Sequence, residues 1–267
     1  MFSFTRRRAS WLAICCMSLA LVAACHTKRE DLTKASPEVL YQRGNKQLKS
    51  YDFGGAIRTY EALAARFPFT DQARQARLDL MYAYYRQGER ESAIDAADTF
   101  IRENPTHPRV DYAYYIKGLV DFERSANAIE RLLRVDLSER APSNARKSFT
   151  AFGTIVEKYP NSDYAHDALQ RMIYLRNRLA SYEVNVARYY FKRGAYVAAA
   201  QRAKEAIDDY DGAPAVREAL QILVVSYERL NLNELAERAR ALYTDNYGND
   251  SEKLAQADDR KHWWKFW

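Results

Sequence analysis

The chain has 267 residues, with 41 Lys and Arg against 35 Asp and Glu, and its formal net charge is +6. Arg6, Arg7 and Arg8 lie in a segment that we expect to be removed, which leaves 38 basic against 35 acidic residues, a net charge of +3. So small an excess argues against a dedicated nucleic-acid-binding protein. Only 9 Gly and 7 Pro, with abundant Ala, Leu, Arg and Tyr, predict an all-α protein.

Residues 1–24 have the features of a lipoprotein signal peptide. The basic residues precede an apolar run from Trp11 to Val22, which is too short to span a bilayer. Small residues then lead to Cys25. We expect cleavage before Cys25, attachment of diacylglycerol and an N-acyl chain to its mature end, and a tether over residues 25–35. The alternative is an ordinary signal peptide that ends near a cysteine.

The other two cysteines, Cys15 and Cys16, fall within the signal peptide, so Cys25 is the only mature cysteine and no internal disulfide is expected. Several acyl chains anchor a protein stably in a bilayer. In bacteria that sort lipoproteins by the next residue, Asp favours the inner membrane, whereas His26 here favours the outer membrane. The predicted location is therefore the outer membrane, lipid-anchored and facing the periplasm.

Similar residues recur at an interval of 37 residues, as between Ala56 and Ala93 and again between Ala199 and Ala236. This spacing resembles the tetratricopeptide (TPR) repeat, a helix-turn-helix unit that buries its apolar face only by stacking on its neighbours. The residues that fall on the TPR pattern are Gly44, Tyr84, Gly88, Ala93, Phe100 and Pro105. We expect a TPR-like α-solenoid of about five repeats. An irregular helical bundle is the alternative.

The third repeat departs from the pattern. Asp111 to Phe122 predicts its first helix and Ala145 to Tyr159 its second, which leaves an inserted loop over residues 123–144 where a TPR has a short turn. Long insertions in compact folds are often functional, although a surface loop without a function would explain this one equally well.

A single long helix is expected after Pro160. Ser162 or Asp163 can cap its start, and nothing interrupts the helical pattern before Arg193. A helix of about 30 residues would be about 45 Å long. It would join an N-terminal half, residues 36–159, to a C-terminal half, residues 160–247, so that the two could move or bind separately.

Residues 248–267 form a tail that ends in aromatic residues. Trp263, Trp264 and Trp267 lie beside Lys265 and Phe266, a combination that favours the bilayer interface. We expect an interfacial tail that docks on the inner leaflet or in an apolar groove of a partner. A disordered, dispensable end is the alternative.

No motif for catalysis or metal binding is present. The glycines form no phosphate-binding loop, no nucleophile elbow occurs, and no His or Cys pair has metal-ligand spacing. We therefore expect no catalytic residues, no metal and no cofactor other than the lipid on Cys25.

The chain is instead rich in tyrosine, with 20 in all. On TPR geometry, Tyr84, Tyr114 and Tyr190 fall at packing positions. The residues expected to face the concave groove are Tyr41, Asn45, Tyr82, Tyr85, Tyr112 and Tyr115. Because Tyr combines an apolar ring with a polar tip at low entropy cost, these side chains suit peptide recognition. The alternative is that about half of these side chains lie in the hydrophobic core or at the rim of the groove.

Longer strings occur in a characteristic order between Cys25 and Asn246. They include Arg66-Phe67-Pro68-Phe69, Asn104-Pro105-Thr106-His107-Pro108, Tyr159-Pro160-Asn161-Ser162 and Arg178-Leu179-Ala180-Ser181-Tyr182-Glu183. In these strings the chain resembles the BamD family, the TPR lipoproteins of the outer-membrane β-barrel assembly machinery. That family also has an insertion in its third repeat.

The resemblance implies a non-enzymatic scaffold. Members of the family bind the POTRA region of the barrel-inserting subunit, hold accessory outer-membrane lipoproteins and help to receive unfolded outer-membrane proteins. The N-terminal half would be the substrate side and the C-terminal half the assembly side. Arg202 matches a family arginine at the POTRA-facing surface. Two other classes stay open: a TPR lipoprotein of another envelope machine, such as a pilotin, and an envelope enzyme built on a solenoid.

Overall fold

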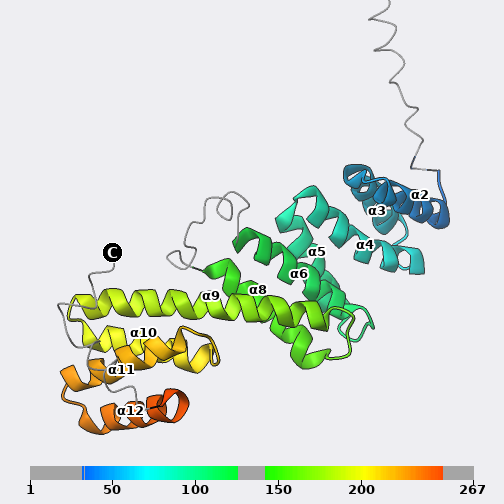
Figure 1. Ribbon diagram of the computed structural model, residues 1–267. Helices are drawn as coiled ribbons and strands as arrows, with labels where there is room; N and C mark the ends of the chain where they lie inside the picture. Colours follow the sequence, from blue (N-terminus) through cyan, green and yellow to red (C-terminus); the bar gives the residue numbers. More distant parts are fainter. Residues whose placement is uncertain (1–31, 33, 126–141, 249–267) are drawn as a thin grey trace, which may run out of the picture.

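The computed structural model describes residue 32, residues 34–125 and residues 142–248. Within these ranges the regular structure consists of ten helices (Figure 1). They are α2 (Pro37–Lys49), α3 (Phe53–Arg66), α4 (Asp71–Gln87), α5 (Arg90–Glu103), α6 (Val110–Ser125), α8 (Ser143–Lys158), α9 (Ala165–Lys192), α10 (Tyr196–Asp209), α11 (Val216–Arg229) and α12 (Asn233–Tyr247). The predicted all-α class is confirmed.

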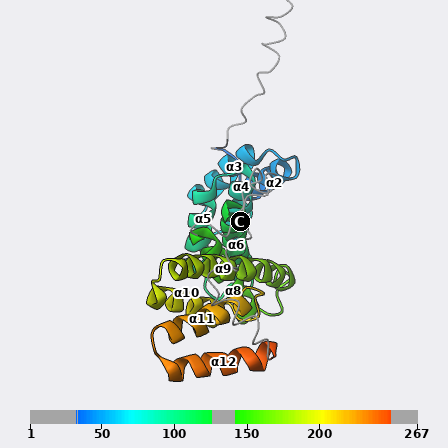
Figure 2. The same ribbon diagram turned by 60° about the vertical axis from the view of Figure 1, so that its left-hand side comes forward.

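The helices pack in chain order as five pairs. The pairs are α2–α3, α4–α5, α6–α8, α9–α10 and α11–α12, and each helix also packs against the next one along the chain. Figure 2 shows the pairs following one another from α2–α3 at one end to α11–α12 at the other. This arrangement confirms a TPR-like solenoid of about five repeats.

Glycine permits the closest approach within two of the pairs. A Cβ on Gly44 of α2 would lie 2.4 Å from the ring of Tyr60 on α3, and a Cβ on Gly118 of α6 would lie 2.4 Å from the ring of Phe152 on α8. Both rings are fully buried. The aromatic side chain of one helix therefore fills the space that the glycine of its partner leaves open.

The third pair keeps this packing despite the insertion. The first helix, expected to end at Phe122, continues to Ser125, and the second begins at Ser143. The Ser148 hydroxyl donates a hydrogen bond of 2.8 Å to the carbonyl of Gly118, which fastens α8 to α6. The remainder of the predicted insertion, residues 126–141, lies outside the described residues.

The predicted long helix is α9, whose 28 residues correspond to about 42 Å. Its N-terminal part lies beside α8 and its C-terminal part beside α10 (Figure 1). Its N-cap residue is Tyr164, so neither Ser162 nor Asp163 caps it as expected. The Ser162 hydroxyl donates to Asp111 Oδ2 at 2.6 Å and accepts from the backbone N–H of Tyr164, just before the helix, at 3.1 Å.

The apolar core runs along the array as a series of clusters, and α9 belongs to two of them. Leu175 and Leu179 share a cluster with Phe152 of α8. Val184 and Ala187 belong to the next cluster, with residues of α10 and α11. The predicted boundary between residues 159 and 160 therefore crosses a continuous core, and the division into two functional halves stays a prediction.

Candidate functional site

The candidate site is the surface that the first helices of the first three pairs share. α4 contacts both α2 and α6. Each contributes two of the predicted groove residues, and all six are half-buried. The tyrosines pack on one side against the core clusters, and we call this surface the aromatic groove. Its residues are Tyr41 and Asn45 on α2, Tyr82 and Tyr85 on α4, and Tyr112 and Tyr115 on α6.

A half-buried carboxylate, that of Asp79, lies at the α2 end of the groove. The hydroxyl of Tyr41 donates to Asp79 Oδ2 at 3.0 Å, and the amide of Gln75 donates to Asp79 Oδ1 at 3.4 Å. Burial raises the pKa of the Asp79 carboxyl above its usual range, although these two hydrogen bonds and the charge of Arg109 act against the shift. Burial, together with Asp79, also raises the pKa of Tyr41 to about 12.

The middle of the groove is aromatic and carries a cation. The ring of Tyr82 meets the ring of Phe53 edge-on, with centroids 6.3 Å apart, and lies 6.4 Å from the ring of Tyr85. The guanidinium of Arg86 is 4.9 Å from the Phe53 ring centroid and 5.5 Å from that of Tyr82. Cations above aromatic rings are attracted by the negative face of the ring. The three rings and Arg86 are therefore held together as a unit.

At the other end, the groove continues onto the start of α9. Tyr115 stacks on Tyr164 with ring centroids 4.6 Å apart and donates a 2.8 Å hydrogen bond to Asp167 Oδ2. Tyr112 lies 5.5 Å from the same Tyr164 ring. Arg171 donates to Asp167 Oδ2 at 2.6 Å. The groove is therefore a band of rings with polar groups at both ends.

The packing positions expected for three other tyrosines agree with the structure. Tyr84, Tyr114 and Tyr190 each pack against a core cluster. Tyr84 also donates a 2.6 Å hydrogen bond to Glu61 of α3. The groove tyrosines are also half-buried and pack against core clusters, so the structure does not separate the two sets by burial.

Arg202 lies in a different place, on α10. Its Nη1 donates to Glu183 Oε2 at 3.1 Å and to Glu205 Oε2 at 2.9 Å, and its side chain is 36% exposed. Glu183 is 1% exposed and also binds Arg146 of α8. Arg202 therefore has an intramolecular role, which the sequence did not reveal, and still presents part of its side chain to solvent.

The remaining predicted site residues cannot be placed in the fold. Cys25 and the tail tryptophans Trp263, Trp264 and Trp267 lie outside the described residues. Within the part of the chain that the structure describes, no group of three or more His, Cys, Asp or Glu could hold a metal ion. No helix in that part is long and apolar enough to cross a membrane.

Comparison with known proteins gives consistent matches over most of the chain. The family model YfiO, described as an outer membrane lipoprotein, matches residues 33–242. The outer membrane protein assembly factor BamD of Neisseria gonorrhoeae is 41% identical over 234 residues, which cover 87% of each chain. The protein of the same name from Pasteurella multocida is 35% identical over 95% of this chain and 98% of its own length. That from Vibrio cholerae is 34% identical over 85% of this chain and 94% of its own.

Proposed function

The chain belongs to the BamD (YfiO) family of outer-membrane lipoproteins, and from this we propose that it is a non-enzymatic scaffold of the outer-membrane β-barrel assembly complex. It holds the barrel-inserting subunit through the POTRA region of that subunit and helps to receive unfolded outer-membrane proteins for insertion. Accessory outer-membrane lipoproteins bind the same scaffold.

The aromatic groove supports the substrate role. An unfolded barrel segment is extended and rich in aromatic residues, so a band of rings gives it apolar contacts, and hydroxyl and carboxylate groups at the two ends can meet its backbone. The observation that carries this assignment is that these rings lie on adjoining helices, from the Tyr41–Asp79 contact on α2 and α4 to the Tyr115–Tyr164 stack on α6 and α9.

The C-terminal half takes the assembly role in this proposal. Arg202 contacts the POTRA region with the exposed part of its guanidinium, while Glu183 and Glu205 hold the side chain in one orientation. An arginine that is already oriented loses less freedom on binding than a mobile one, which favours its use at an interface.

The anchor completes the proposal. Lipid on Cys25 holds the mature chain at the outer membrane on the periplasmic side, and residues 25–35 connect the lipid to α2. The tail with Trp263, Trp264 and Trp267 adds a second attachment, either to the inner leaflet or to an apolar groove of a partner.

Site-specific crosslinking tests the proposal as a whole. A photoreactive residue in place of Tyr82 should crosslink to newly exported barrel proteins, and one in place of Gln201 on α10 should crosslink to the barrel-inserting subunit. Mass spectrometry of the outer-membrane fraction identifies the products. Barrel proteins crosslinked equally from both positions would contradict the assignment of separate substrate and assembly sides.

A further inference from the structure

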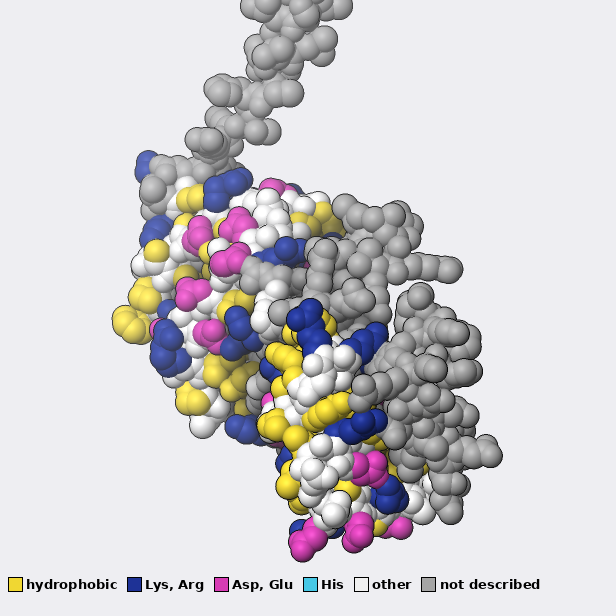
Figure 3. Space-filling model, turned by 90° about the vertical axis from the view of Figure 1, so that its left-hand side faces the viewer, with side chains coloured by type: hydrophobic (Ala, Val, Ile, Leu, Met, Phe, Trp, Pro, Cys, Tyr) yellow, Lys and Arg dark blue, Asp and Glu magenta, His cyan; other side chains and the backbone are white. Residues whose placement is uncertain are grey.

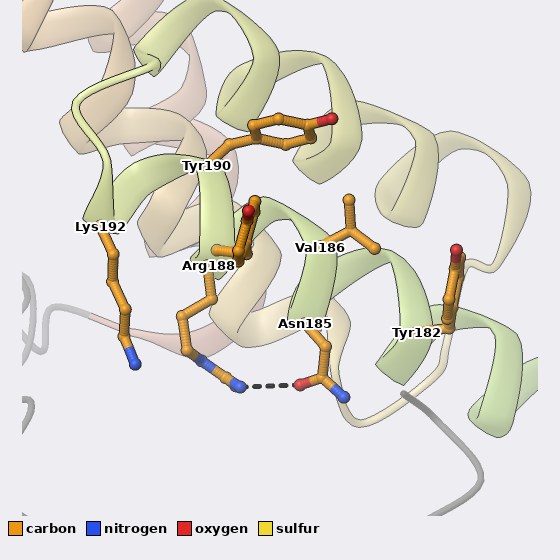
Figure 4. A pocket seen from close by; sticks show the side chains of 7 residues that line it. Tyr182, Asn185, Val186, Arg188, Tyr190 and Lys192 are labelled. Carbon is orange, nitrogen blue, oxygen red and sulfur yellow. Dashed lines mark hydrogen bonds between the residues drawn. The ribbon is translucent and has the colours of Figure 1, made fainter. Parts of the chain in front are cut away.

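The C-terminal part of α9 carries an open pocket of about 440 Å³ that belongs neither to the aromatic groove nor to the Arg202 cluster. All of its lining residues come from α9 itself, between Tyr182 and Lys192 (Figure 4). We call it the α9 pocket.

One side of the α9 pocket is apolar. Tyr182, Val186 and Tyr189 recur at intervals of four and three residues, which places them on one helix face over about 10 Å. Tyr182 and Val186 project to the same side in Figure 4. Tyr189 is 51% exposed, and its ring meets the ring of Tyr190 edge-on at 5.6 Å. Tyr190 packs against the core and supports the ring of the exposed Tyr189, whereas Tyr182 and Val186 are half-buried.

The other side of the pocket is cationic. Arg188 is bound to Glu218 of α11 through two contacts from Nη2, at 2.6 and 2.8 Å, and donates to Asn185 Oδ1 at 2.7 Å. Lys192 is exposed, and the exposed Arg193 places its guanidinium 4.4 Å from the centroid of the Tyr189 ring. The Glu218 carboxylate balances the charge of Arg188, and the exposed cations at this end of the pocket are Lys192 and Arg193. The pocket therefore attracts negatively charged groups.

Apolar side chains continue beyond the pocket at the same end of the array. Val197, in the first turn of α10, is 69% exposed, and Leu232, between α11 and α12, is 43% exposed. Both lie where the α9–α10 and α11–α12 pairs turn. Figure 3 looks onto this end and shows hydrophobic side chains among Lys and Arg as well as Asp and Glu. Exposed apolar side chains that lie close together suit a docking site for a polypeptide.

We propose that the α9 pocket binds an acidic peptide segment of a partner protein. One apolar side chain of the segment lies between Tyr182 and Tyr189, and flanking carboxylates face Lys192 and Arg193. The pocket belongs to the fourth helix pair, whereas the predicted lipid tether enters the first pair at α2, so the geometry favours a protein occupant over the membrane surface. The inference deepens the proposed scaffold role, because it describes the chemistry of one partner.

Selection from a random twelve-residue peptide library on the purified full-length protein in detergent tests this proposal. Binders should carry Asp or Glu on either side of one Leu, Phe or Trp. A fluorescent copy of the strongest binder should lose at least tenfold in affinity when its acids become Lys or when its apolar residue becomes Ala. Its affinity should also fall at high salt.

Variants then place the peptide on the protein. Lys192→Glu with Arg193→Glu, and separately Val186→Asp, should each reduce affinity at least tenfold. The matched controls Lys204→Glu with Lys158→Glu, exposed cations on other helices, should not. Tyr82→Ala with Tyr85→Ala should leave this affinity unchanged while it impairs substrate crosslinking, so a failure here is separable from a failure of the substrate role.

Three results would overturn the proposal. The first is a selection whose binders are not enriched in Asp or Glu. The second is equal peptide affinity of the pocket variant Lys192→Glu, Arg193→Glu and of the control variant Lys204→Glu, Lys158→Glu. The third concerns anionic phosphatidylglycerol vesicles and protein that carries no lipid on Cys25. It is vesicle binding that Lys192→Glu with Arg193→Glu abolishes and that the peptide does not inhibit. That last result would assign the pocket to lipid headgroups instead.

Discussion

The Glu183 carboxylate accepts a hydrogen bond from Arg202 at 3.1 Å, and this contact joins α9 to α10. Glu183 is 1% exposed and also binds Arg146, so three helices meet at one buried carboxylate. A buried carboxylate that loses its ionic partners is strongly destabilising. Charge reversal at Arg202 therefore acts on the fold as well as on any partner, and a test of the interface has to separate the two effects.

The first prediction concerns the two roles of this cluster, beginning with stability. Arg202→Met should lower the free energy of unfolding. The loss should be smaller than the roughly 3–5 kcal/mol that follows removal of one partner of a buried ion pair, because Arg146 still binds the Glu183 carboxylate. Adding Glu183→Gln should recover most of the loss, since the amide carries no charge. Urea unfolding followed by far-UV circular dichroism measures both. A single variant as stable as the wild type would show that the contact does not hold α10.

The same two variants extend this prediction to the assembly surface. If Arg202 contacts the POTRA region directly, the double variant should regain stability yet bind an immobilised POTRA fragment more weakly than the wild type. Glu183→Gln alone, which keeps the arginine, should bind nearly normally. If the double variant binds as well as the wild type, Arg202 acts only through Glu183 and does not belong to the interface.

The second prediction concerns the aromatic groove. Tyr82→Ala with Tyr85→Ala should reduce crosslinking to unfolded barrel segments more than it reduces the melting temperature, because both rings are half-buried and each presents one side to solvent. Phe69→Ala is the control, since Phe69 is 91% exposed outside the groove. A collapse of stability that precedes any loss of crosslinking would mean that these tyrosines are core residues.

The third prediction is a pH dependence that comes from Asp79. Because burial raises the pKa of Asp79 in the folded state, the ionised carboxylate costs stability at neutral pH. Its contribution to the free energy of unfolding should therefore rise as the pH falls through the folded pKa and level off below the unfolded value near 3.8.

Asp79→Asn isolates this effect, because the amide keeps an acceptor for the Tyr41 hydroxyl and does not ionise in this range. The difference in unfolding free energy between wild type and variant should change with pH in the direction given above. A difference that stays flat between neutral pH and the unfolded pKa would rule out a raised pKa.

The recurrence at 37 residues was enough to predict the helix pairs, because close crossings demand small side chains and therefore leave a trace in the sequence. TPR geometry also placed the tyrosines of α2, α4 and α6 on adjoining helices. The sequence did not predict that Asp79 lies in the groove, because a single acidic residue between Leu78 and Leu80 has the pattern of a solvent-exposed position. The Glu183–Arg202 contact could not be predicted for a different reason. Charged residues on separate helices show no periodicity in the sequence that would indicate which of them pair.

The fourth prediction concerns the anchor. Cys25→Ala should abolish labelling by radioactive palmitate and release the mature chain into the soluble periplasmic fraction, because the thiol is the attachment point for lipid. Cys16→Ala, within the expected signal peptide, is the matched control and should leave both properties unchanged. Persistent labelling of the Cys25 variant would exclude Cys25 as the attachment site, whereas loss of labelling with continued membrane association would mean that partners alone retain the protein.

The last prediction concerns the aromatic tail, where Trp263, Trp264 and Trp267 are the only tryptophans of the expected mature chain, since Trp11 is in the signal peptide. Intrinsic tryptophan fluorescence therefore reports on the tail without labelling. If the tail docks on the inner leaflet, phospholipid vesicles should shift its emission to the blue, and removal of residues 260–267 should weaken membrane association of the Cys25→Ala variant. If it docks in a partner, the shift should require the barrel-inserting subunit. Emission that stays water-like with vesicles and with the partner would show that the tail is not a second attachment, because indole rings that leave water for an apolar site must change their emission.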